Sequence, residues 1–362
     1  MKNSLLSRKI VLVIPSLRHG GAERVISILA NQWAEDENSE ITLLLLVKQE
    51  KYYQLDSRVI LIEPQRQYSD NTISKSVYTI WTINFIRKHI KEIRPTVILS
   101  FCERYNNLVL FSLIGLQFKV FVSDRNNPSN YIGNLHEILR KILYKSATGI
   151  IAQTKRGKLV LEAKTKNTNI SCIPNPLRDI INFNVSREKI ILNVGRNEKQ
   201  KNQLELIDIF SKLKNAVDWK LYILGNGSLR PFLQTKVNKL GLENRVVLME
   251  FQTDIDFYFQ QASIFAFPSL YEGFPNALSE AMANGLPCVA YDCPTGPAEM
   301  IDDAVNGFLV PLNDKSFFTE RLQLLVNDHS LRIDLGGEAS KIKERLSSEK
   351  ICNEYINTIL ER

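Results

Sequence analysis

Arg196 and Lys201 are two cations that follow an apolar run, residues 190–194, with the pattern of a buried strand. In parallel α/β sheets, ligands bind beyond the carboxyl ends of the strands. Two cations at that place suit a diphosphate because they balance its negative charge, and Gly195 beside them lets the backbone approach it closely. The same residues would also fit a solvated loop of Lys and Arg.

Two glutamates, Glu272 and Glu280, follow a second apolar run at residues 264–267. The loop after this run contains a glycine, and Pro275 marks the first turn of an expected helix, where proline is favoured. Ionised carboxylates accept hydrogen bonds from paired hydroxyls, such as those of a ribose or a hexose. Backbone amides of the loop and helix start are expected to face an anion or sugar hydroxyls, namely those of Gly273, Phe274 and Asn276.

Two carboxylates could also serve a glycosidase, in which an acid and a nucleophile flank the bond that breaks. Here, part of a helix separates the two glutamates along the chain, whereas glycosidase pairs usually come from different strands. The cations at Arg196 and Lys201 also match a phosphate, which a simple glycosidase substrate lacks. We therefore interpret both glutamates as ligands of one sugar nucleotide.

A glycine pair, Gly20 and Gly21, stands in a strand-to-helix turn after the apolar run 10–14. Such glycines let the backbone approach a phosphate, and the helix amino terminus behind them carries a partial positive charge. The full Gly-x-Gly-x-x-Gly fingerprint is absent from the sequence, which argues against an NAD enzyme. A tight turn that needs glycine for its own sake is the other interpretation.

Elements that could position these residues recur along the chain. Short runs rich in Val and Ile alternate with amphipathic helical segments, as in parallel sheets covered on both faces. The runs lie at 10–14, 41–47, 59–62, 97–101, 120–123 and 149–152, and again at 190–194, 220–224, 245–250, 264–267, 288–291 and 307–310. Because the alternation restarts, we predict an α/β protein with two Rossmann-like domains, each a doubly wound parallel sheet.

The domain boundary is expected near Pro174 and Pro176, which forbid a regular helix and favour an extended connector. We place an amino-terminal, acceptor-binding domain at 1–175 and a linker at 176–186. A carboxy-terminal, donor-binding domain follows at 187–345. The last segment, 346–362, has the pattern of a one-faced helix, and packing back on the first domain is one arrangement for it.

The order of these motifs resembles the retaining GT-B glycosyltransferases of family four. Glu272 and Glu280 match the Glu-x7-Glu motif of that family, as Glu-Gly-Phe-Pro-x4-Glu-Ala-Met-Ala-x-Gly-x-Pro. Gly-Gly-Ala-Glu-Arg of the first loop, Gly-Arg with Lys-Asn at 195–202, Leu-Gly-Asn-Gly at 224–227 and Asn-Gly-Phe-Leu-Val at 306–310 are similar to its other landmarks. The resemblance covers nearly the whole chain and implies two Rossmann-like domains that face each other across a cleft.

The resemblance also implies a role for each residue. Arg196 and Lys201 would bind the donor diphosphate and stabilise the charge that grows on it as the glycosidic bond breaks. Glu280 would bind the ribose hydroxyls, and Glu272 those of the transferred sugar. Further donor contacts would come from glycines and from loop and helix-start residues, namely Gly20, Gly21, Gly195, Gly225, Gly273, Phe274, Pro275, Asn276 and Ala277.

One loop departs from the family pattern. Many relatives have a His near the reacting sugar carbon, where this sequence has Asp124 and Arg125. An Arg stays protonated and cannot act as a base, although it could bind an acceptor phosphate or stabilise the reacting sugar. We predict both residues to be catalytic, with the proton acceptor being Asp124, the donor phosphate or a group near the acceptor.

No metal ion and no other cofactor is expected to be required, because Arg and Lys serve the diphosphate. Asp254 and Asp256 are spaced like the Asp-x-Asp metal motif of the other glycosyltransferase fold. They precede an expected helix at 257–262, however, where Asp is a common N-cap. The five cysteines are scattered and never spaced as Cys-x-x-Cys, so they indicate neither a zinc site nor a disulfide framework.

The charge is unevenly distributed. Residues 1–185 contain 26 Lys and Arg against 15 Asp and Glu, a net charge of +11, whereas residues 186–362 contain 20 against 24, a net charge of −4. A basic half fits anionic lipid or a phosphorylated acceptor, and no nucleic-acid-binding motif accompanies it. The helical segment 75–94, rich in aromatic and basic residues, would either lie on an anionic membrane or pack one face in the core.

The sequence carries neither a long apolar run nor a signal peptide, so we expect a cytoplasmic protein, or one peripheral on the inner face of the membrane. We predict transfer of a hexose or N-acetylhexosamine from a UDP-sugar, with a GDP-sugar as second choice. The predicted acceptor is a lipid-linked glycan in O-antigen, capsule or related polysaccharide synthesis. A sugar-nucleotide epimerase and a non-catalytic nucleotide-binding paralogue are the alternatives.

Overall fold

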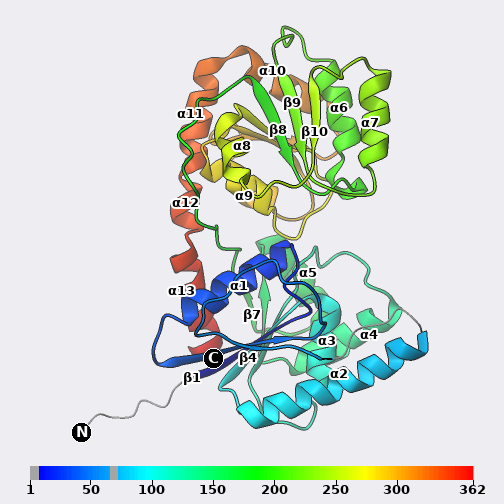
Figure 1. Cartoon of the computed structure of the whole chain (residues 1–362), viewed down its shortest axis with the longest axis vertical. Coiled ribbons are helices and arrows are strands. Elements are labelled where there is room, and N and C mark those ends of the chain that lie inside the picture. The colour runs from blue at the N-terminus through cyan, green and yellow to red at the C-terminus, as the bar shows by residue number, and fades with distance from the viewer. Residues whose placement is uncertain (1–7, 66–71, 362) are drawn as a thin grey trace. The chain divides into compact units, whose positions relative to one another are not determined.

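The computed structural model describes residues 8–65 and 72–361, which divide into two compact units (Figure 1). The first unit comprises Met1–Pro176 and Ser348–Arg362, and the second comprises Leu177–Ser347. Each unit is built on its own parallel sheet. Within the described residues, no helix is both long enough and apolar enough to cross a membrane.

The sheet of the first unit has seven strands in the order β3-β2-β1-β4-β5-β6-β7. The strands are β1 (Arg8–Ile14), β2 (Ser39–Leu45), β3 (Ile60–Ile62), β4 (Val97–Phe101), β5 (Val120–Ser123), β6 (Gly149–Ala152) and β7 (Ile170–Cys172). The helices are α1 (Gly21–Trp33), α2 (Thr72–Ile93), α3 (Glu103–Ser112), α4 (Asn134–Leu143), α5 (Lys155–Thr165) and α13 (Ser348–Glu361), with a short 3-10 helix η1 (Tyr144–Ser146).

The central strand β1 pairs with β2 on one side and β4 on the other, so that Ile10 stands opposite both Ile41 and Val97. Its last five residues are buried, because both faces of the sheet are covered by helices. The strand order changes direction at β1 and β4. Right-handed crossovers therefore place α1 and α3 on opposite faces.

Helices α2, α3, α4 and α5 pack side by side in this order, each against the next. The aromatic side of α2 belongs to this layer, since Ile86 and Ile90 are buried and the Tyr78 hydroxyl donates to the Leu46 carbonyl oxygen (2.8 Å). The sequence left two interpretations of segment 75–94, a membrane surface and the domain core. The aromatic side of the segment packs against the core.

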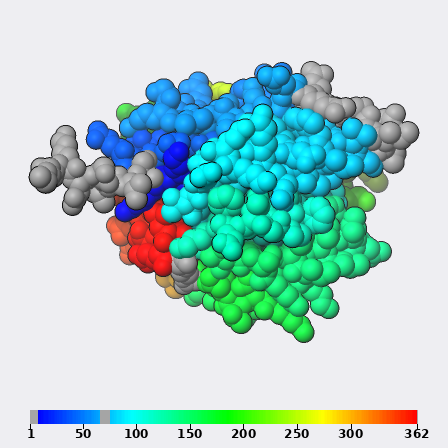
Figure 2. All heavy atoms as spheres, turned by 90° about the horizontal axis from the view of Figure 1, so that it is seen from below, coloured from blue at the N-terminus to red at the C-terminus, as the bar shows by residue number. Residues whose placement is uncertain are grey.

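The last helix, α13, packs against α1 in the first unit. Trp33 Nε1 donates to the backbone carbonyl oxygen of Cys352 at 3.1 Å, and Tyr355 is completely buried. Figure 2 shows this carboxy-terminal segment, in red, beside the blue amino-terminal part of the chain. The first unit thus contains both ends of the described chain.

The sheet of the second unit has six strands in the order β10-β9-β8-β11-β12-β13. The strands are β8 (Ile190–Val194), β9 (Lys220–Leu224), β10 (Val246–Met249), β11 (Ile264–Phe267), β12 (Cys288–Asp292) and β13 (Phe308–Pro311). The helices are α6 (Gln203–Ser211), α7 (Arg230–Lys239), α8 (Ile255–Gln261), α9 (Asn276–Ala283), α10 (Lys315–Asn327), α11 (His329–Ser340) and α12 (Ile342–Arg345), with 3-10 helices η2 (Lys199–Lys201) and η3 (Pro297–Glu299).

Apolar side chains of the second sheet and its helices form one core, which includes Phe210 of α6, Leu233 of α7 and Phe318 of α10. Helix α10 begins where the Asp314 side chain accepts a hydrogen bond from the Phe317 amide. The structure confirms the predicted α/β fold with two doubly wound parallel sheets. The structure also contains β7, which was not predicted from the sequence.

Candidate functional site

Strands β8 and β11 are neighbours at the point where the strand order of the second sheet reverses. The loops that follow them therefore meet at the carboxyl edge of the sheet. Lys201 Nζ and Glu272 Oε1 lie 2.6 Å apart, and their side chains are 14% and 7% exposed. The structure thus joins a predicted diphosphate ligand to a predicted sugar ligand.

The side chain of Lys201 extends over the Phe267 ring, with Nζ 5.3 Å from its centroid, and along Gly195. A Cβ atom at Gly195 would lie 3.0 Å from Lys201 Cε, so a larger residue there would displace the lysine. Gly225 has φ +149°, and its Cβ would lie 2.0 Å from the Gly195 carbonyl oxygen. Both glycines are therefore required by the close approach of two loops.

Gln200 joins the two loops and was missed by the sequence analysis. Its Nε2 atom donates to Glu272 Oε2 (3.2 Å) and to the Tyr271 carbonyl oxygen (2.7 Å). The Leu270 amide donates to the Gln200 carbonyl oxygen (2.9 Å), and the Thr295 hydroxyl donates to the Glu272 carbonyl oxygen. These partners fix the Glu272 backbone and carboxylate, but a lone Gln or Thr in a loop carries no recognisable signal.

Arg196 is exposed at the carboxyl end of β8. It lines a depression of about 340 Å³ together with Lys199, Gln200, Tyr271 and residues of the β9–α7 loop. Because Gln200 also bonds to Glu272, this depression adjoins the Lys201–Glu272 pair. Glu198 also lines it, but its carboxylate accepts hydrogen bonds from the Ser228 amide and hydroxyl, so the exposed cations Arg196 and Lys199 make the depression suitable for an anion.

Glu280 lies on α9 and is buried, with its carboxylate 3.7 Å from Arg178 Nε. The same guanidinium donates to both carboxylate oxygens of Asp256, at 2.6 and 2.7 Å. Such a fork-shaped pair fixes the orientation of an Arg. Arg178 is thus a second residue that the sequence analysis missed, since its partners are 78 and 102 positions away in the chain.

The expectation that Asp254 and Asp256 cap a helix holds only in part, because Asp254 occupies the N-cap position of α8 while Asp256 does not. Helix α8 begins earlier, at Ile255, and the Asp254 side chain makes no capping hydrogen bond. Asp256 lies within the first turn, where it accepts bonds from Arg178 and from the Ile181 amide (2.9 Å). Its carboxylate anchors the chain segment that enters the second unit, because an ion pair there outweighs a local cap.

The start of α9 differs from its prediction in two details. Pro275 occupies the N-cap position rather than the first turn, and the helix begins at Asn276. The Asn276 amide donates to the Phe274 carbonyl oxygen (3.0 Å), so this amide is engaged within the loop rather than facing an anion. A Cβ atom at Gly296 would lie 2.4 Å from Pro275 Cδ, which shows that the β12–η3 loop presses on Pro275. Gly273 and Ala277 flank this segment in the loop and in the first helical turn.

In the first unit, Gly20 and Gly21 stand at the start of α1, which begins at Gly21. The Gly20 carbonyl oxygen accepts a hydrogen bond from the Tyr53 hydroxyl (2.9 Å). A Cβ atom at Gly20 would lie 2.2 Å from a carboxylate oxygen of Glu23. A larger residue at Gly20 would displace the Glu23 carboxylate, while Gly21 is exposed.

Arg125 is buried inside the first unit, at the carboxyl end of β5. Its guanidinium donates to the Tyr355 hydroxyl (3.1 Å) and to Asn175 Oδ1 (2.6 Å), and it lies 4.2 Å from the Phe101 ring centroid. Tyr355 belongs to α13. Through these contacts, Arg125 connects α13 to the carboxyl edge of the sheet.

Asp124 is also buried, and its Oδ1 atom accepts hydrogen bonds from the Tyr144 hydroxyl (2.5 Å) and Asn106 Nδ2 (3.2 Å). Arg140 NH2 lies 3.7 Å from its Oδ2 atom. Burial, reinforced by the negative charge of Glu103, raises the pKa of Asp124 to about 6. The structure thus brings Asp124 and Arg125 together with interior partners and not with solvent.

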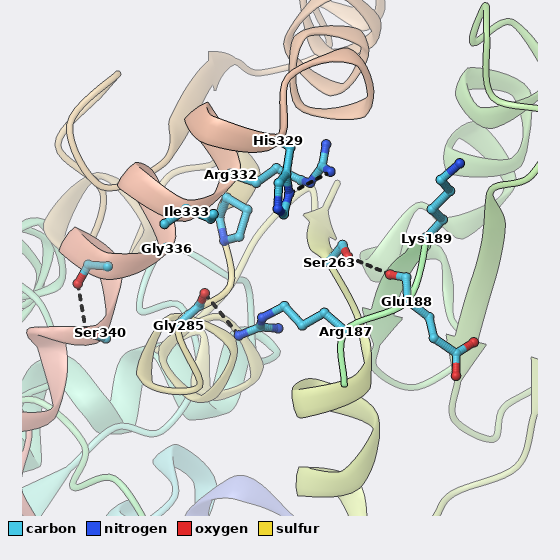
Figure 3. Close-up of a pocket in the computed structure, with 12 residues that line it drawn as sticks. Arg187, Glu188, Lys189, Ser263, Gly285, His329, Arg332, Ile333, Gly336 and Ser340 are labelled. Atoms are coloured by element: carbon cyan, nitrogen blue, oxygen red, sulfur yellow. Dashed lines mark hydrogen bonds between the residues drawn. The ribbon is translucent and has the colours of Figure 1, made fainter. Parts of the chain in front are cut away.

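A separate hollow of about 390 Å³ lies at the opposite edge of the second sheet (Figure 3). It is lined by residues that precede β8, β11 and β12 and by α11. Its Arg187 donates to the carbonyl oxygens of Ala262 (2.5 Å) and Asn284 (2.6 Å), just after α8 and α9. This hollow lies at the amino ends of the strands, so it is not the edge where the predicted donor ligands gather.

Comparison with known proteins identifies the family. The sequence profile of the family "Glycosyl transferases group 1" matches residues 178–342, which include the Lys201–Glu272 pair and Glu280. The chain thus carries the domain of the group 1 glycosyltransferases at residues 178–342. The resemblance inferred from the Glu-x7-Glu motif is therefore confirmed.

Two relatives are similar to this chain over most of their length. One is a GalNAc-α-(1→4)-GalNAc-α-(1→3)-diNAcBac-PP-undecaprenol α-1,4-N-acetyl-D-galactosaminyltransferase of Campylobacter jejuni, 25% identical over 98% of each chain. The other is the amylovoran biosynthesis glycosyltransferase AmsD of Erwinia amylovora, 28% identical over 90% of this chain and 92% of that protein.

The fold of the glycosyltransferase is also that of solved structures. HepE of Anabaena, solved in complex with UDP and glucose, superimposes with a TM-score of 0.78 over 98% of this chain and 100% of that one, at 16% identity. The two Rossmann-like units accordingly form a GT-B fold, as the sequence predicted.

Proposed function

We propose that this group 1 glycosyltransferase moves a hexose or N-acetylhexosamine from a UDP-sugar to a lipid-linked glycan, with retention of the anomeric configuration. The observation that carries the proposal is the Lys201–Glu272 pair at the carboxyl edge of the second sheet, beside the exposed cation Arg196. The relatives named above act on an undecaprenyl-diphosphate glycan and in amylovoran biosynthesis, and HepE binds UDP and glucose. We place the reaction on the cytoplasmic face of the membrane, in surface-polysaccharide synthesis.

In this mechanism, the bond between the anomeric carbon and the diphosphate oxygen breaks, and UDP leaves with the electron pair. Lys201 and Arg196 stabilise the negative charge that develops on the diphosphate, because cations held beside that oxygen offset the growing charge. Glu272 accepts hydrogen bonds from hydroxyls of the sugar while Lys201 turns from the carboxylate towards the phosphate. Glu280, oriented by Arg178, accepts from the ribose hydroxyls.

The acceptor hydroxyl attacks the anomeric carbon and loses its proton. Of the three proton acceptors that the sequence left open, Asp124 is buried and bonded to Tyr144 and Asn106. We therefore assign the proton to an oxygen of the departing diphosphate. The acceptor oxygen then replaces the diphosphate on the same face of the sugar.

A donor panel tests this proposal. The enzyme is incubated with UDP- and GDP-linked hexoses and N-acetylhexosamines and with lipid-linked oligosaccharides, and nucleotide release and product structure are followed. We expect UDP release, an extended glycan and a retained anomeric configuration. Glu280→Ala and Lys201→Ala should each abolish transfer. An isomerised sugar nucleotide without acceptor extension, or full activity of both variants, would refute the proposal.

A further inference from the structure

Helix α4 (Asn134–Leu143) in the first unit turns its apolar side outwards. Leu135, Ile138 and Ile142 are 65%, 57% and 59% exposed. Their spacing of three, four and seven residues puts them on one face of the helix, where they form a continuous stripe. Isolated exposed apolar side chains are common, but a contiguous stripe marks an interaction surface.

The inward side of α4 includes a buried charge beside its leucines. Arg140 is 1% exposed and donates to the Pro128 carbonyl oxygen (3.1 Å), with its NH2 atom 3.7 Å from Asp124 Oδ2. The orientation of the helix is therefore fixed by a buried ion pair and by Leu143, the other buried residue of α4. The stripe cannot turn into the core without removing Arg140 from its partners.

The charges around the stripe are arranged by sign. Lys141 and Lys145 are exposed, and they lie three residues after Ile138 and Ile142, on the flank of the stripe. The acidic residue Glu137 faces away, because it pairs with Arg140 (3.8 Å) and with Lys164 of α5 (3.5 Å). The outward side of α4 thus combines three apolar side chains with positive charge.

We propose that this stripe of α4, with its two lysines, docks the enzyme on the surface of an anionic phospholipid bilayer. The proposal rests on the proposed peripheral localisation and names the surface that makes the contact. In an interfacial helix, apolar side chains enter the acyl boundary, and flanking lysines reach the lipid phosphates through their flexible stems. The net charge of +11 in residues 1–185 adds a long-range attraction to the same surface.

A bilayer fits this surface better than a protein partner does. Protein interfaces are enriched in aromatic residues, Met and Arg and depleted in Lys, whereas this stripe consists of Leu and Ile flanked by Lys. Tyr131, which is 68% exposed in the loop before α4, adds a side chain of the type found at membrane interfaces. For segment 75–94 the sequence left a membrane surface and a core face as alternatives, and its aromatic side packs in the core.

Vesicle co-sedimentation tests the proposal on the full chain. Binding is measured with vesicles of equal parts phosphatidylglycerol and phosphatidylcholine and with phosphatidylcholine alone, without donor or acceptor. We expect binding to the anionic vesicles that weakens as salt shortens the Debye length below about 10 Å. Replacing Leu135, Ile138 and Ile142 together by Gln should weaken it by about tenfold or more, since each apolar side chain leaving water favours binding.

Two further variants make the test specific. Lys141→Gln with Lys145→Gln should weaken binding several-fold and reduce its salt dependence. The matched control replaces three exposed apolar residues of the second unit, Val217, Phe232 and Ile333, by Gln, and it should bind as the unmodified chain does. Thermal denaturation checks that all variants fold, which their exposed positions favour.

The proposal is overturned if the chain binds neither vesicle, or if the α4 variant binds the anionic vesicles as tightly as the control. It is also overturned if sedimentation velocity shows that the α4 variant dissociates a dimer while vesicle binding is unchanged, because the stripe would then cover a second copy. Transfer to a water-soluble acceptor is measured in parallel. It depends on the second-unit site, so failure of docking and failure of the proposed function give different results.

Discussion

The charged residues that follow β8 and β11 in the second unit and those that follow β5 in the first lie at the same kind of place, the carboxyl end of a parallel strand. Lys201 and Glu272 pair mainly with each other and adjoin an open depression lined by Arg196. Arg125 and Asp124 are surrounded by interior partners, among them Tyr355 and Tyr144. The two clusters share a position in the fold but differ in whether charged groups are left open to a ligand.

This difference teaches that a charged loop at a sheet edge is not by itself a binding site. Side-chain partners inside the protein decide whether the charge serves a ligand or the fold. We therefore expect changes in the second-unit cluster to alter sugar transfer and changes in the first-unit cluster to alter stability. The following four predictions test that contrast.

The largest effect is expected from Lys201→Met combined with Glu272→Gln. Removing a preorganised group that stabilises transition-state charge typically lowers the rate by about 100- to 1,000-fold. Because both members of the pair are replaced, no partly buried charge is left unpaired, and the fold is retained. Steady-state kinetics and thermal denaturation measure the two quantities, with the exposed Lys212→Met as the matched control. Near-normal transfer by the double variant would remove the pair from the site.

Arg125→Met is expected to act on stability. Asn175 Oδ1 and the Tyr355 hydroxyl would each lose a hydrogen bond to a charged group, which contributes about 1.5–3 kcal/mol, although Gln153 Nε2 still donates to Asn175 Oδ1 (2.8 Å). We expect the free energy of unfolding in urea to fall by about 3 kcal/mol, with transfer per folded molecule retained. If transfer is lost while unfolding is unchanged, Arg125 is a catalytic residue, as the sequence predicted, and the contrast between the clusters fails.

Arg178→Ala sharpens the role of Glu280. Without the guanidinium 3.7 Å away, the carboxylate is no longer held in place for the ribose. Titration calorimetry should show binding of UDP weakened by about tenfold, the effect of about 1.4 kcal/mol. Arg178→Lys keeps the charge but loses the fork-shaped contact with Asp256, so it should recover only part of the affinity. Unchanged UDP binding in both variants would separate Arg178 from the donor site.

The smallest effect is the pH dependence contributed by Asp124. Its pKa in the folded state is about 6, above the ordinary value of 3.8, so the unfolded chain releases this proton first as the pH rises. This group therefore makes the free energy of unfolding fall between about pH 4 and pH 6. The Asp124→Asn side chain cannot ionise. The free energy of unfolding of this variant, measured in urea at about pH 4 and pH 6, should therefore lack the fall that Asp124 contributes. An identical slope in both proteins would show that Asp124 is ionised in the fold.

Much of the fold was predictable because strands buried on both faces read as continuous apolar runs. Strand β7 (Ile170–Cys172) escaped prediction, since its three residues are too few for a pattern. In the site, Lys201 and Glu272 were predictable because their motifs stand directly after strands. Their direct pairing was not, because it depends on contacts 71 positions apart in the chain.

The orientation of α4 could not be predicted for a different physical reason. A periodic apolar pattern indicates a helix with one apolar face, but it does not say that this face is the buried one. The ion pair of Arg140 with Asp124, 16 positions earlier in the chain, holds the Arg140 side of the helix inwards and leaves the apolar stripe exposed. Similarly, the burial of Arg125 depends on Tyr355, 230 positions later.

The grouping of α13 with the first unit has a consequence for how the protein is made. The ribosome releases the residues of the second unit as one uninterrupted stretch, so that unit can fold during translation. The first unit must wait until α13 has been synthesised before Tyr355 reaches Arg125 and Cys352 reaches Trp33. The half of the enzyme that is translated first is therefore the half that is completed last.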